Sequence, residues 1–401
     1  MSGYRDLLRT RGVARIIGAQ LTARLPSGML SLAFLLHIER IHDSYAAAGL
    51  VLAATSVGQA VAGPLTSRWM GRWGMRPVLI LTLSICTAAI IAVALLTLPV
   101  WAYMLLGLTA GLSTPPIQPA VRTIYPKMVT SRQLTPLFSL DASAQELIWV
   151  SGPVITTFVA TQVSTVAAIL LAGAFLVGGG VWFIASPEVG RVRIPRSKRS
   201  FGVVLRNRPV LLATITGFLL VGSCAAVEVG VIAVFGDHGA EAGILLAIWA
   251  LGSLAGGLGF GHLPIGPWAL ARRMLIVFVG LALAAFGLNF WWLAVTLLIA
   301  GAGIAPALAV MFAIVSASVK FSDTAEAYGW VGTGQLIGAA LGSAVAGFLI
   351  DDLGAIGGFY AAIAFAAVGM LVPTIFRAWH PDLRGRDASP LPDTEPVQVV
   401  S

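Results

Sequence analysis

The chain has 401 residues, of which 58% are hydrophobic and 10% are charged, and its formal net charge at pH 7 is +8. Soluble proteins carry about 25% charged residues because their surface faces water. This composition therefore excludes an ordinary soluble domain and predicts a protein whose surface faces the lipid of a membrane.

Apolar stretches of the length that crosses a bilayer, about 20 residues, recur along the whole chain. The first runs too long for a signal-peptide core and has no small-residue cleavage site after it, so we expect it to be retained. The sequence predicts an all-α polytopic membrane protein with twelve transmembrane helices. In chain order the expected spans are 12–36, 46–67, 78–99, 102–123, 138–160, 165–186, 209–235, 239–260, 273–290, 292–316, 326–350 and 355–377.

The basic side chains indicate how these spans are oriented. If successive spans alternate in direction, all but two of the 25 Lys and Arg residues lie on the same side of the membrane. The exceptions are Arg24, inside the first span, and Arg40, in the loop after it. Because basic loops are retained in the cytoplasm, both termini are expected there. The positive charge therefore reflects topology, and no nucleic-acid partner is expected.

The spans divide into two sets of six. A basic cytoplasmic linker, 187–208, separates a predicted six-helix bundle at 1–186 from a second one at 209–378. Residues 379–401 are rich in Pro and Asp and are expected to form a disordered cytoplasmic tail. Short echoes at an offset of about 190 residues indicate a duplicated unit, an arrangement that places a substrate site between the two halves. The echoes pair 63–65 with 256–258, 110–115 with 302–306, and 145–148 with 335–337.

The loop after the second span carries a motif of glycines and arginines. Its residues are Gly63, Leu65, Ser67, Arg68, Gly71, Arg72, Gly74 and Arg76. This order resembles the loop signature of the major facilitator superfamily, Gly-x-Leu-x-Asp-Arg-x-Gly-Arg-Arg, and the resemblance covers essentially the whole chain. Ser67 replaces the aspartate, so the latch attributed to that aspartate is not carried over. The resemblance implies a twelve-helix secondary transporter that works by alternating access, generally as a monomer.

The same loop is expected to form a conformational gate. Its glycines allow a tight turn between antiparallel helices, and its arginines reach helix carbonyls or acids of the other half. Alternatively, the arginines only hold the loop in the cytoplasm. The expected gate residues are Gly63, Arg68, Gly71, Arg72 and Arg76, together with Asp323 and Glu326 at the start of the eleventh span.

A second motif lies in the fifth span. Gly152 and Pro153 resemble the centre of Gly-x-x-x-Gly-Pro-x-x-Gly-Gly, which is associated with export by proton exchange, although other residues replace the flanking glycines. As a packing feature, the same pair kinks a helix without any transport role. The arginine expected inside the fourth span of proton-coupled exporters is absent. Proton-coupled efflux of a small organic solute is our prediction, with a facilitator or importer, or a non-transporting sensor, as the alternative.

Ionisable side chains at bilayer depth mark candidate sites, because each costs about 2.5–3.5 kcal/mol there and tends to face a partner or a water-filled cavity. Glu146 and Glu228 are the expected proton carriers, and Arg24 would orient a carboxylate or the substrate. A permanent salt bridge is the alternative for each of them. Asp141 is expected to stabilise a helix N-terminus or to pair with Arg122.

Amide and tryptophan side chains inside the spans are candidates for the lining of a substrate cavity. Such a mixed lining suits a mid-sized, partly apolar organic solute. The candidates are Gln20, Gln118, Gln145, Trp149, Trp249, Trp330 and Gln335.

No pattern in the sequence predicts an enzyme. The five histidines are scattered without metal-ligand spacing, and there is no phosphate-binding Gly-x-x-x-x-Gly-Lys-Ser/Thr loop. We therefore expect no metal and no cofactor, and an ion gradient, here protons, would drive any pumping. The preference for Arg over Lys, with abundant Ala and Gly, suggests the cytoplasmic membrane of a bacterium.

Overall fold

Helices account for most of the chain in the computed structural model, which describes residues 2–197, 199–235, 241–260, 263–386 and 388–393. The first two residues of the span expected at 239–260, Lys198 of the expected linker, and Asp387 and residues 394–401 of the expected tail lie outside the described residues. Within the described residues no strand forms, and a single bridge joins Lys320 to Leu391.

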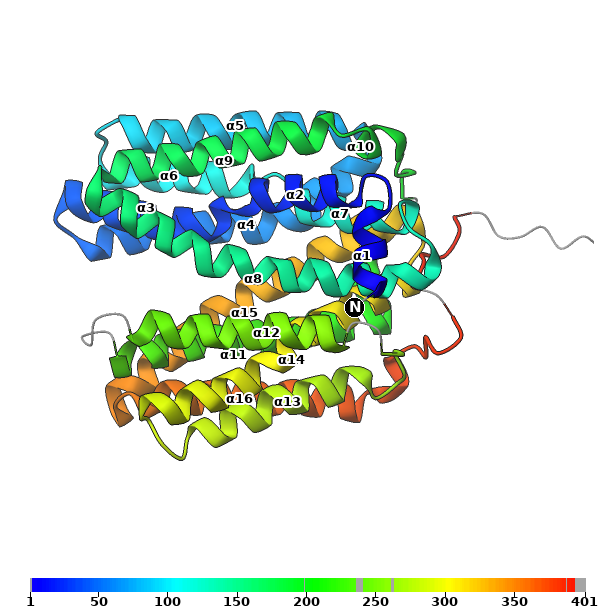
Figure 1. The fold of residues 1–401 in the computed structure, drawn as a ribbon. Helices are drawn as coiled ribbons and strands as arrows, with labels where there is room; N and C mark the ends of the chain where they lie inside the picture. The colour runs from blue at the N-terminus through cyan, green and yellow to red at the C-terminus, as the bar shows by residue number, and fades with distance from the viewer. Residues whose placement is uncertain (1, 198, 236–240, 261–262, 387, 394–401) are drawn as a thin grey trace, which may run out of the picture.

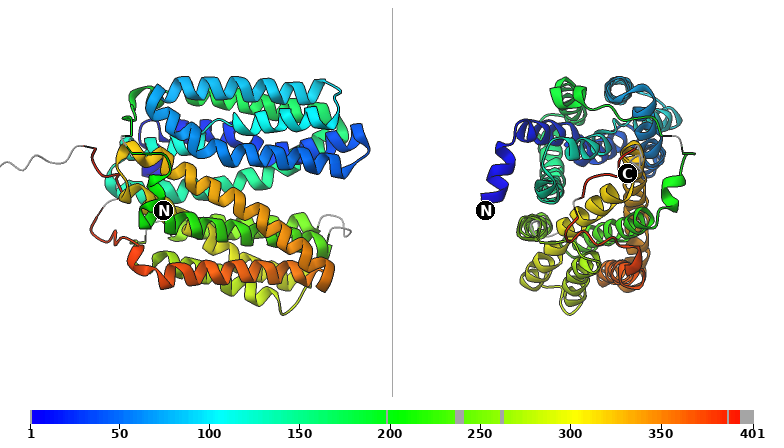
Figure 2. Two further views of the ribbon diagram at one scale, coloured as in Figure 1. Left: turned by 180° about the vertical axis from the view of Figure 1, so that it is seen from behind. Right: turned by 90° about the vertical axis from the view of Figure 1, so that its right-hand side faces the viewer.

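Two groups of helices pack side by side (Figures 1 and 2). The first group, with a short leading helix and a short trailing one, consists of α1 (Ser2–Arg9), α2 (Val13–Arg24), α3 (Pro26–His42), α4 (Tyr45–Trp73), α5 (Met75–Leu95), α6 (Val100–Leu112), α7 (Ile117–Ile124), α8 (Ser131–Gln162), α9 (Thr165–Ala185) and α10 (Pro187–Arg191). The second group consists of α11 (Arg208–Phe235), α12 (Glu241–Phe260), α13 (Ala269–Ala284), α14 (Phe290–Ser318), α15 (Thr324–Leu353) and α16 (Ile356–Ile375). Short 3-10 turns lie at Tyr125–Lys127, Val203–Arg206, Phe321–Asp323 and Arg377–Trp379.

Nine segments of the described chain are long and apolar enough to cross a membrane. One of them runs from Val13 to His42 and joins α2 to α3 across Pro26. Three expected spans are not among these nine segments. The fourth is divided between α6 and α7, the fifth is α8, which is less apolar, and the ninth is α13, which has only 16 residues. The chain is thus an all-helical, multi-pass membrane protein.

The span expected at 102–123 is not one helix. It ends as α6 at Leu112 and resumes as α7 at Ile117. Pro115 and Pro116 lie in the gap, and a proline both lacks an N–H donor and forces the preceding residue out of the α-helical conformation. The expected span therefore consists of two helices with a break at 113–116.

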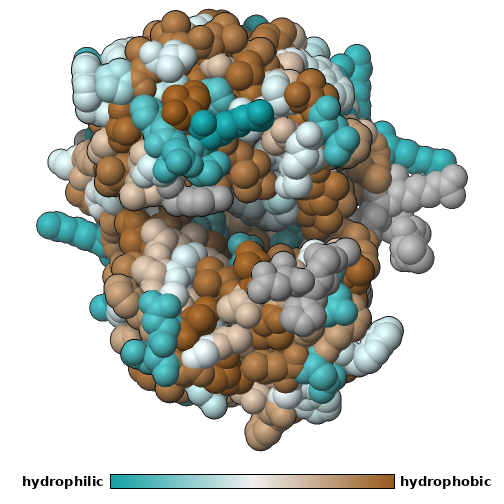
Figure 3. Space-filling model, turned by 90° about the vertical axis from the view of Figure 1, so that its left-hand side faces the viewer, coloured by the Kyte–Doolittle hydropathy of each residue, from teal (hydrophilic) through white to brown (hydrophobic). Residues whose placement is uncertain are grey.

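The two ends of the molecule differ in character. At the end on the right of Figure 1 lie α1, the α4–α5 turn, α10 and the tail; we call it the basic end because Arg68, Arg76 and Arg191 lie there. The other end, which we call the far end, is seen in Figure 3 with a hollow between the two groups and hydrophilic side chains at its depth. The helices α4, α7 and α8 of the first group contact α12, α14 and α15 of the second.

The described part of the tail makes backbone hydrogen bonds to the second group of helices. The Leu391 N–H donates to the Val319 carbonyl at 2.9 Å, and the Phe321 N–H donates to the Leu391 carbonyl at 3.1 Å. Farther back, the Leu383 N–H donates to the Ile265 carbonyl at 2.9 Å. Leu383 and Ala388 are buried, so apolar residues scattered among prolines and charges hold this segment against the basic end.

Candidate functional site

A buried ion cluster occupies the first group near the break between α6 and α7. Asp141 of α8 is fully buried, and its carboxylate accepts a hydrogen bond from Arg122 Nε at 3.0 Å. Arg24, the last residue of α2, lies on its other side with Nη1 at 3.8 Å. Arg24 therefore pairs with Asp141 rather than with a glutamate, and Asp141 pairs with Arg122 as expected.

Glutamine side chains join this cluster together. Gln20 donates to Asp141 Oδ1 at 2.9 Å and accepts from Arg24 Nη1 at 2.8 Å. The side-chain amide oxygen of Gln145 (Oε1) accepts from Arg24 Nη2 at 2.6 Å and from Arg122 Nη2 at 3.3 Å. Gln118 lies 3.5 Å from Gln145 and faces Arg122. Two guanidinium groups thus share one carboxylate, and the cluster has a net positive charge.

The second group of helices covers this cluster. The Arg122 guanidinium carbon lies 3.4 Å from the centre of the Phe312 ring of α14, within the range of a cation–π contact. Arg122 lies in the last turn of α7, at the end of the fourth span as the sequence predicts. It is also one of the largest fully buried side chains.

The two glutamates expected to carry protons lie in different groups of helices. Glu146 is on α8 and Glu228 is on α11, and both act electrostatically on Cys224 of α11. Glu228 is exposed and Glu146 is half-buried. Within the described residues, no basic group lies within 4.0 Å of either carboxylate.

Ionic contacts at the basic end connect α4 to α15 and to the segment between the groups. Arg68 Nη1 lies 2.8 Å from Glu326 Oε2, and the Gly202 N–H donates to the other oxygen of Glu326 at 2.8 Å. Asp323 accepts from Ser197 at 2.5 Å and lies 3.7 Å from Arg199. Both acids at the start of α15 therefore bind the 197–202 segment, and Glu326 also binds α4.

Helix backbones touch beneath these ionic contacts. A Cβ added at Gly329 of α15 would lie 2.6 Å from the carbonyl oxygen of Gly63 in α4. The Thr333 hydroxyl donates to the Ala60 carbonyl at 2.7 Å, and the Ser139 hydroxyl of α8 donates to the Gly257 carbonyl of α12. The two groups are thus in close contact at the basic end and separated by the hollow at the far end.

Two overlapping matches to the family model of the Major Facilitator Superfamily cover residues 16–288 and 233–399. The chain belongs to this superfamily. Its family is one of membrane transporters, and this supports a transporter rather than an enzyme. No curated protein matches the sequence.

Solved structures of transporters share this superfamily fold. The human organic anion transporter MFSD10 (TETRAN) superposes with a TM-score of 0.70 at 17% identity, covering 90% of this chain and 99% of that one. A bacterial homologue of the iron transporter ferroportin in an outward-facing state gives 0.72 at 14% identity, covering 92% and 100%. The same homologue with soaked iron gives 0.73 at 15%, covering 92% and 99%. Likeness at this level of identity concerns the fold alone.

The remaining cavity candidates of this superfamily member lie apart from the ion cluster. Trp149 is 50% exposed and lies one turn of α8 from Gln145. Trp249 is buried against Gly301, and Gln335 packs against Gly217 and Met311 inside the second group. Trp330 lies at the basic end, with its ring centre 5.6 Å from that of Phe201. The structure thus brings three of the glutamines together and leaves Trp249, Trp330 and Gln335 elsewhere.

Two arginines of the expected gate loop do not reach the second group. Arg76 donates to the Ile184 and Ser186 carbonyls, at 3.1 and 3.4 Å, at the end of α9 in its own group. The Arg72 guanidinium stacks on the neighbouring Trp73 ring at 5.9 Å. Gly71 instead lies beside Pro195 in the segment that joins the groups, where an added Cβ would be 3.2 Å from the Pro195 carbonyl oxygen.

The Gly152 and Pro153 pair of this superfamily member packs inside the first group. A Cβ added at Gly152 would lie 2.6–2.8 Å from the backbone of Gly28 in α3. Pro153 lies within α8, which continues through it to Gln162. A close approach of α3 and α8 is therefore sufficient to account for Gly152.

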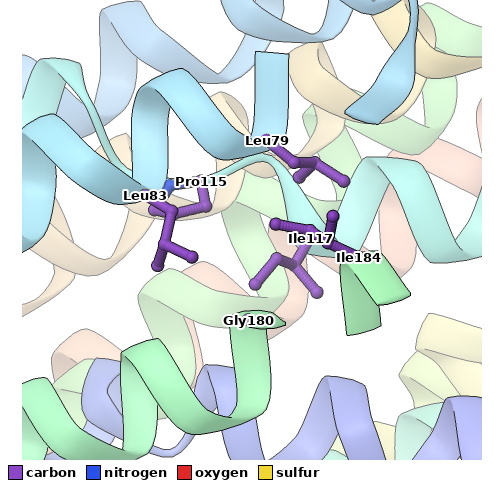
Figure 4. A pocket seen from close by; sticks show the side chains of 6 residues that line it. All are labelled: Leu79, Leu83, Pro115, Ile117, Gly180 and Ile184. Carbon is purple, nitrogen blue, oxygen red and sulfur yellow. The ribbon is translucent and has the colours of Figure 1, made fainter. Parts of the chain in front are cut away.

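Neither a metal site nor an enclosed ligand cavity was found near the ion cluster. Among the described residues, no group of three His, Cys, Asp or Glu side chains could hold a metal ion. The crevice in Figure 4 lies beside the break between α6 and α7, and only apolar or small residues line it. It has no interior space for a solute.

Proposed function

We propose that the chain is a twelve-helix secondary transporter of a bacterial cytoplasmic membrane, with both termini in the cytoplasm. In this topology the spans are the nine apolar segments together with α6–α7, α8 and α13. The two six-helix groups are 1–186 and 209–378, and 187–208 links them. The basic residues of α1, of the α4–α5 turn and of the 187–208 connection lie at the same end of the molecule, which supports this orientation because basic loops are retained in the cytoplasm.

In this orientation the transporter is closed to the cytoplasm and open to the outside. The hollow at the far end and the contacts of Gly63 with Gly329 and of Arg68 with Glu326 support this assignment. The ferroportin homologue with a similar fold is itself outward-facing. Alternating access then requires α4 and α15 to separate at the basic end while the far end closes.

Proton coupling is assigned to Glu146 and Glu228. The observation that carries this proposal is that the two carboxylates, one in each group of helices, have no basic partner within 4.0 Å among the described residues. Unpaired ionisable groups at bilayer depth tend to face water-filled cavities and to mark proton pathways. A proton bound from one side of the membrane can leave on the other side after the groups have moved. Exchange of this proton for a small organic solute is the proposed efflux reaction.

Arg24 has a different part in this proposal from the one that the sequence predicted. Its charge is shared with Asp141 and the amides of Gln20 and Gln145, so it organises the first group beside the hollow. It does not contact Glu146 or Glu228 within 4.0 Å. We therefore assign the proton to the glutamate pair alone.

The net positive charge of the Arg24, Arg122 and Asp141 cluster favours a second candidate, the uptake of an organic anion. MFSD10, whose fold is similar, is an organic anion transporter. In this candidate a substrate carboxylate would complete the charge balance of the cluster, and Arg24, which is 9% exposed, would be the first guanidinium that it meets.

Transport in inside-out vesicles under an imposed proton gradient tests the proposal. We expect accumulation of a substrate that disappears when the gradient is collapsed and in Glu146→Gln or Glu228→Gln. Glu241→Gln, which neutralises an acid at the start of α12, is the matched control and should retain activity. Full gradient-driven activity with both glutamates replaced would exclude them as proton carriers. Equilibration without a gradient would indicate a facilitator, and binding without movement would indicate a sensor.

A further inference from the structure

A second cavity lies at the basic end of the second group, away from the hollow and the glutamate pair. It has a volume of 490 Å³ and lies between the α12–α13 connection and the start of the tail. The hydrogen bond from the Leu383 N–H to the Ile265 carbonyl closes the tail over it. Its lining residues are Pro264, Gly266, Pro267, Trp268, Ala269, Arg272, Arg377, Ala378, His380, Asp382 and Arg384.

Positive charge dominates this cavity. Arg272, Arg377 and Arg384 are exposed at its wall, whereas Asp382 is the one acid in the lining. Asp382 is already paired with Arg384, whose Nη2 lies 2.7 Å away. The Arg272 side chain has no hydrogen bond or ion pair among the described residues, and the Arg377 guanidinium lies over the Trp268 ring at 5.1 Å. Two arginines therefore face the cavity with no carboxylate partner.

A buried histidine is part of the lining of this cavity. His380 is only 4% exposed and lines the cavity, and its Nε2 has no hydrogen-bond partner among the described residues. Its Nδ1 lies 2.8 Å from the Pro381 carbonyl, which fixes the orientation of the ring. Buried polar atoms are normally hydrogen-bonded, so the unpaired Nε2 of His380 in the lining of this cavity favours a site for a polar ligand.

We propose that this cavity binds a phosphate-bearing anion, held by Arg272, Arg377 and His380. Arginine forks suit phosphate oxygens because they donate parallel hydrogen bonds to them. A membrane phospholipid headgroup and a soluble phosphate share this chemistry. Basic pockets at the cytoplasmic ends of membrane helices bind anionic headgroups.

The surroundings of the cavity place it at the height of the headgroups. The Phe376 and Trp379 rings lie 4.4 Å apart at the end of α16, and Trp268 is 39% exposed. Aromatic side chains are enriched at this depth. Ile375, one residue before Phe376, is 68% exposed, as expected for a side chain in contact with acyl chains. The inference depends on the proposed topology in one respect. That topology places the cavity in the cytoplasmic leaflet of the membrane.

The test measures binding alone, so its failure would be distinct from a failure of proton-coupled transport. Delipidated full-length protein is titrated with phosphatidylglycerol, with phosphatidylcholine, or with inorganic phosphate, and bound ligand is counted by native mass spectrometry. The triple variant Arg272→Gln, Arg377→Gln and Arg384→Gln is compared with Arg191→Gln, Arg193→Gln and Arg196→Gln, which removes equal charge from exposed positions of the same end.

We expect phosphatidylglycerol to bind in preference to phosphatidylcholine, and the cavity triple variant to lose about fivefold in affinity for each of Arg272 and Arg377, the two arginines without a carboxylate partner. The control triple variant should keep wild-type affinity, and His380→Phe should weaken binding severalfold. Insensitivity to inorganic phosphate would identify a lipid headgroup as the source, and displacement by it a soluble phosphate compound. Equal losses in the two triple variants, wild-type binding in His380→Phe, or no preference for the anionic ligand would overturn the proposal.

Discussion

The contact between Gly63 and Gly329 gives a direct test of how the basic end closes. In Gly329→Ala the new Cβ would lie 2.6 Å from the Gly63 carbonyl oxygen and 2.8 Å from Pro64 Cα. Ordinary contacts of this kind are about 3.5 Å long, so α4 and α15 must separate by about 1 Å. Overpacking costs about 1–3 kcal/mol, which corresponds to a shift of about 5- to 150-fold away from the closed basic end.

The matched control lies on the same helix. An added Cβ at Gly332 meets nothing within 4 Å, so Gly332→Ala carries the same gain in helix propensity without the clash. Spin labels at Leu96 and Phe286, exposed in far-end connections of the two groups, report the width of the hollow after Cys86 and Cys224 are replaced by alanine. We expect electron–electron double resonance to give a shorter distance in Gly329→Ala and an unchanged one in Gly332→Ala. Identical distances in the two variants would refute the assignment of this contact to the gate.

Three further variants test other parts of the structure. Asp141→Asn leaves the guanidiniums of Arg24 and Arg122 without a carboxylate, so a loss of about 3–5 kcal/mol in stability is expected as a lowered thermal midpoint; an unchanged midpoint would contradict the ion cluster. Glu326→Gln removes the ion pair with Arg68 and the carboxylate that accepts from the Gly202 N–H. Trypsin should therefore cleave at Arg199 faster than in the control Asp352→Asn. Equal rates would contradict the anchoring of the connection by Glu326. Burial holds the pKa of His380 below its usual range, so the unfolded chain takes up a proton first and stability should fall as the pH drops below about 6.5. His380→Gln should flatten that part of the dependence of the thermal midpoint on pH, and parallel curves would exclude this cause.

The sequence was sufficient for features that depend on hydrophobic length and charge distribution. Apolar runs predicted the helices because a bilayer requires about 20 such residues for each span. An ion pair between Arg68 and Glu326 could be predicted because Arg68 lies near the end of one helix and Glu326 near the start of another, at the same end of the molecule. Helix direction alone brings such residues together, so no side-chain detail was needed.

Features that depend on packing between helices or on rotation about a helix axis could not be predicted from hydrophobic length and charge distribution. Arg122 lies at the end of a helix as predicted, but its burial against Asp141 and Phe312 depends on how α7, α8 and α14 pack together. Pro115 and Pro116 are the sequence signal for the break between α6 and α7. Trp330 was assigned to the cavity by residue type, but its position on α15 turns it toward Phe201. Only the packing of neighbouring helices determines that rotation.

The charge balance around the hollow links the class of substrate to the direction of transport. Glu146 and Glu228 carry up to two negative charges, whereas the cluster next to them in α8 carries one positive charge in excess. In the proposed mechanism a cationic solute would compete with the proton for the glutamate pair, and competition for one site would produce exchange in opposite directions. An anionic solute would instead be repelled until the pair is protonated, so proton and anion would move together, inward along a gradient directed into the cell. Cationic and anionic analogues of one compound would therefore separate efflux from uptake: if protons drive both in the same direction, the glutamate pair is not the coupling site.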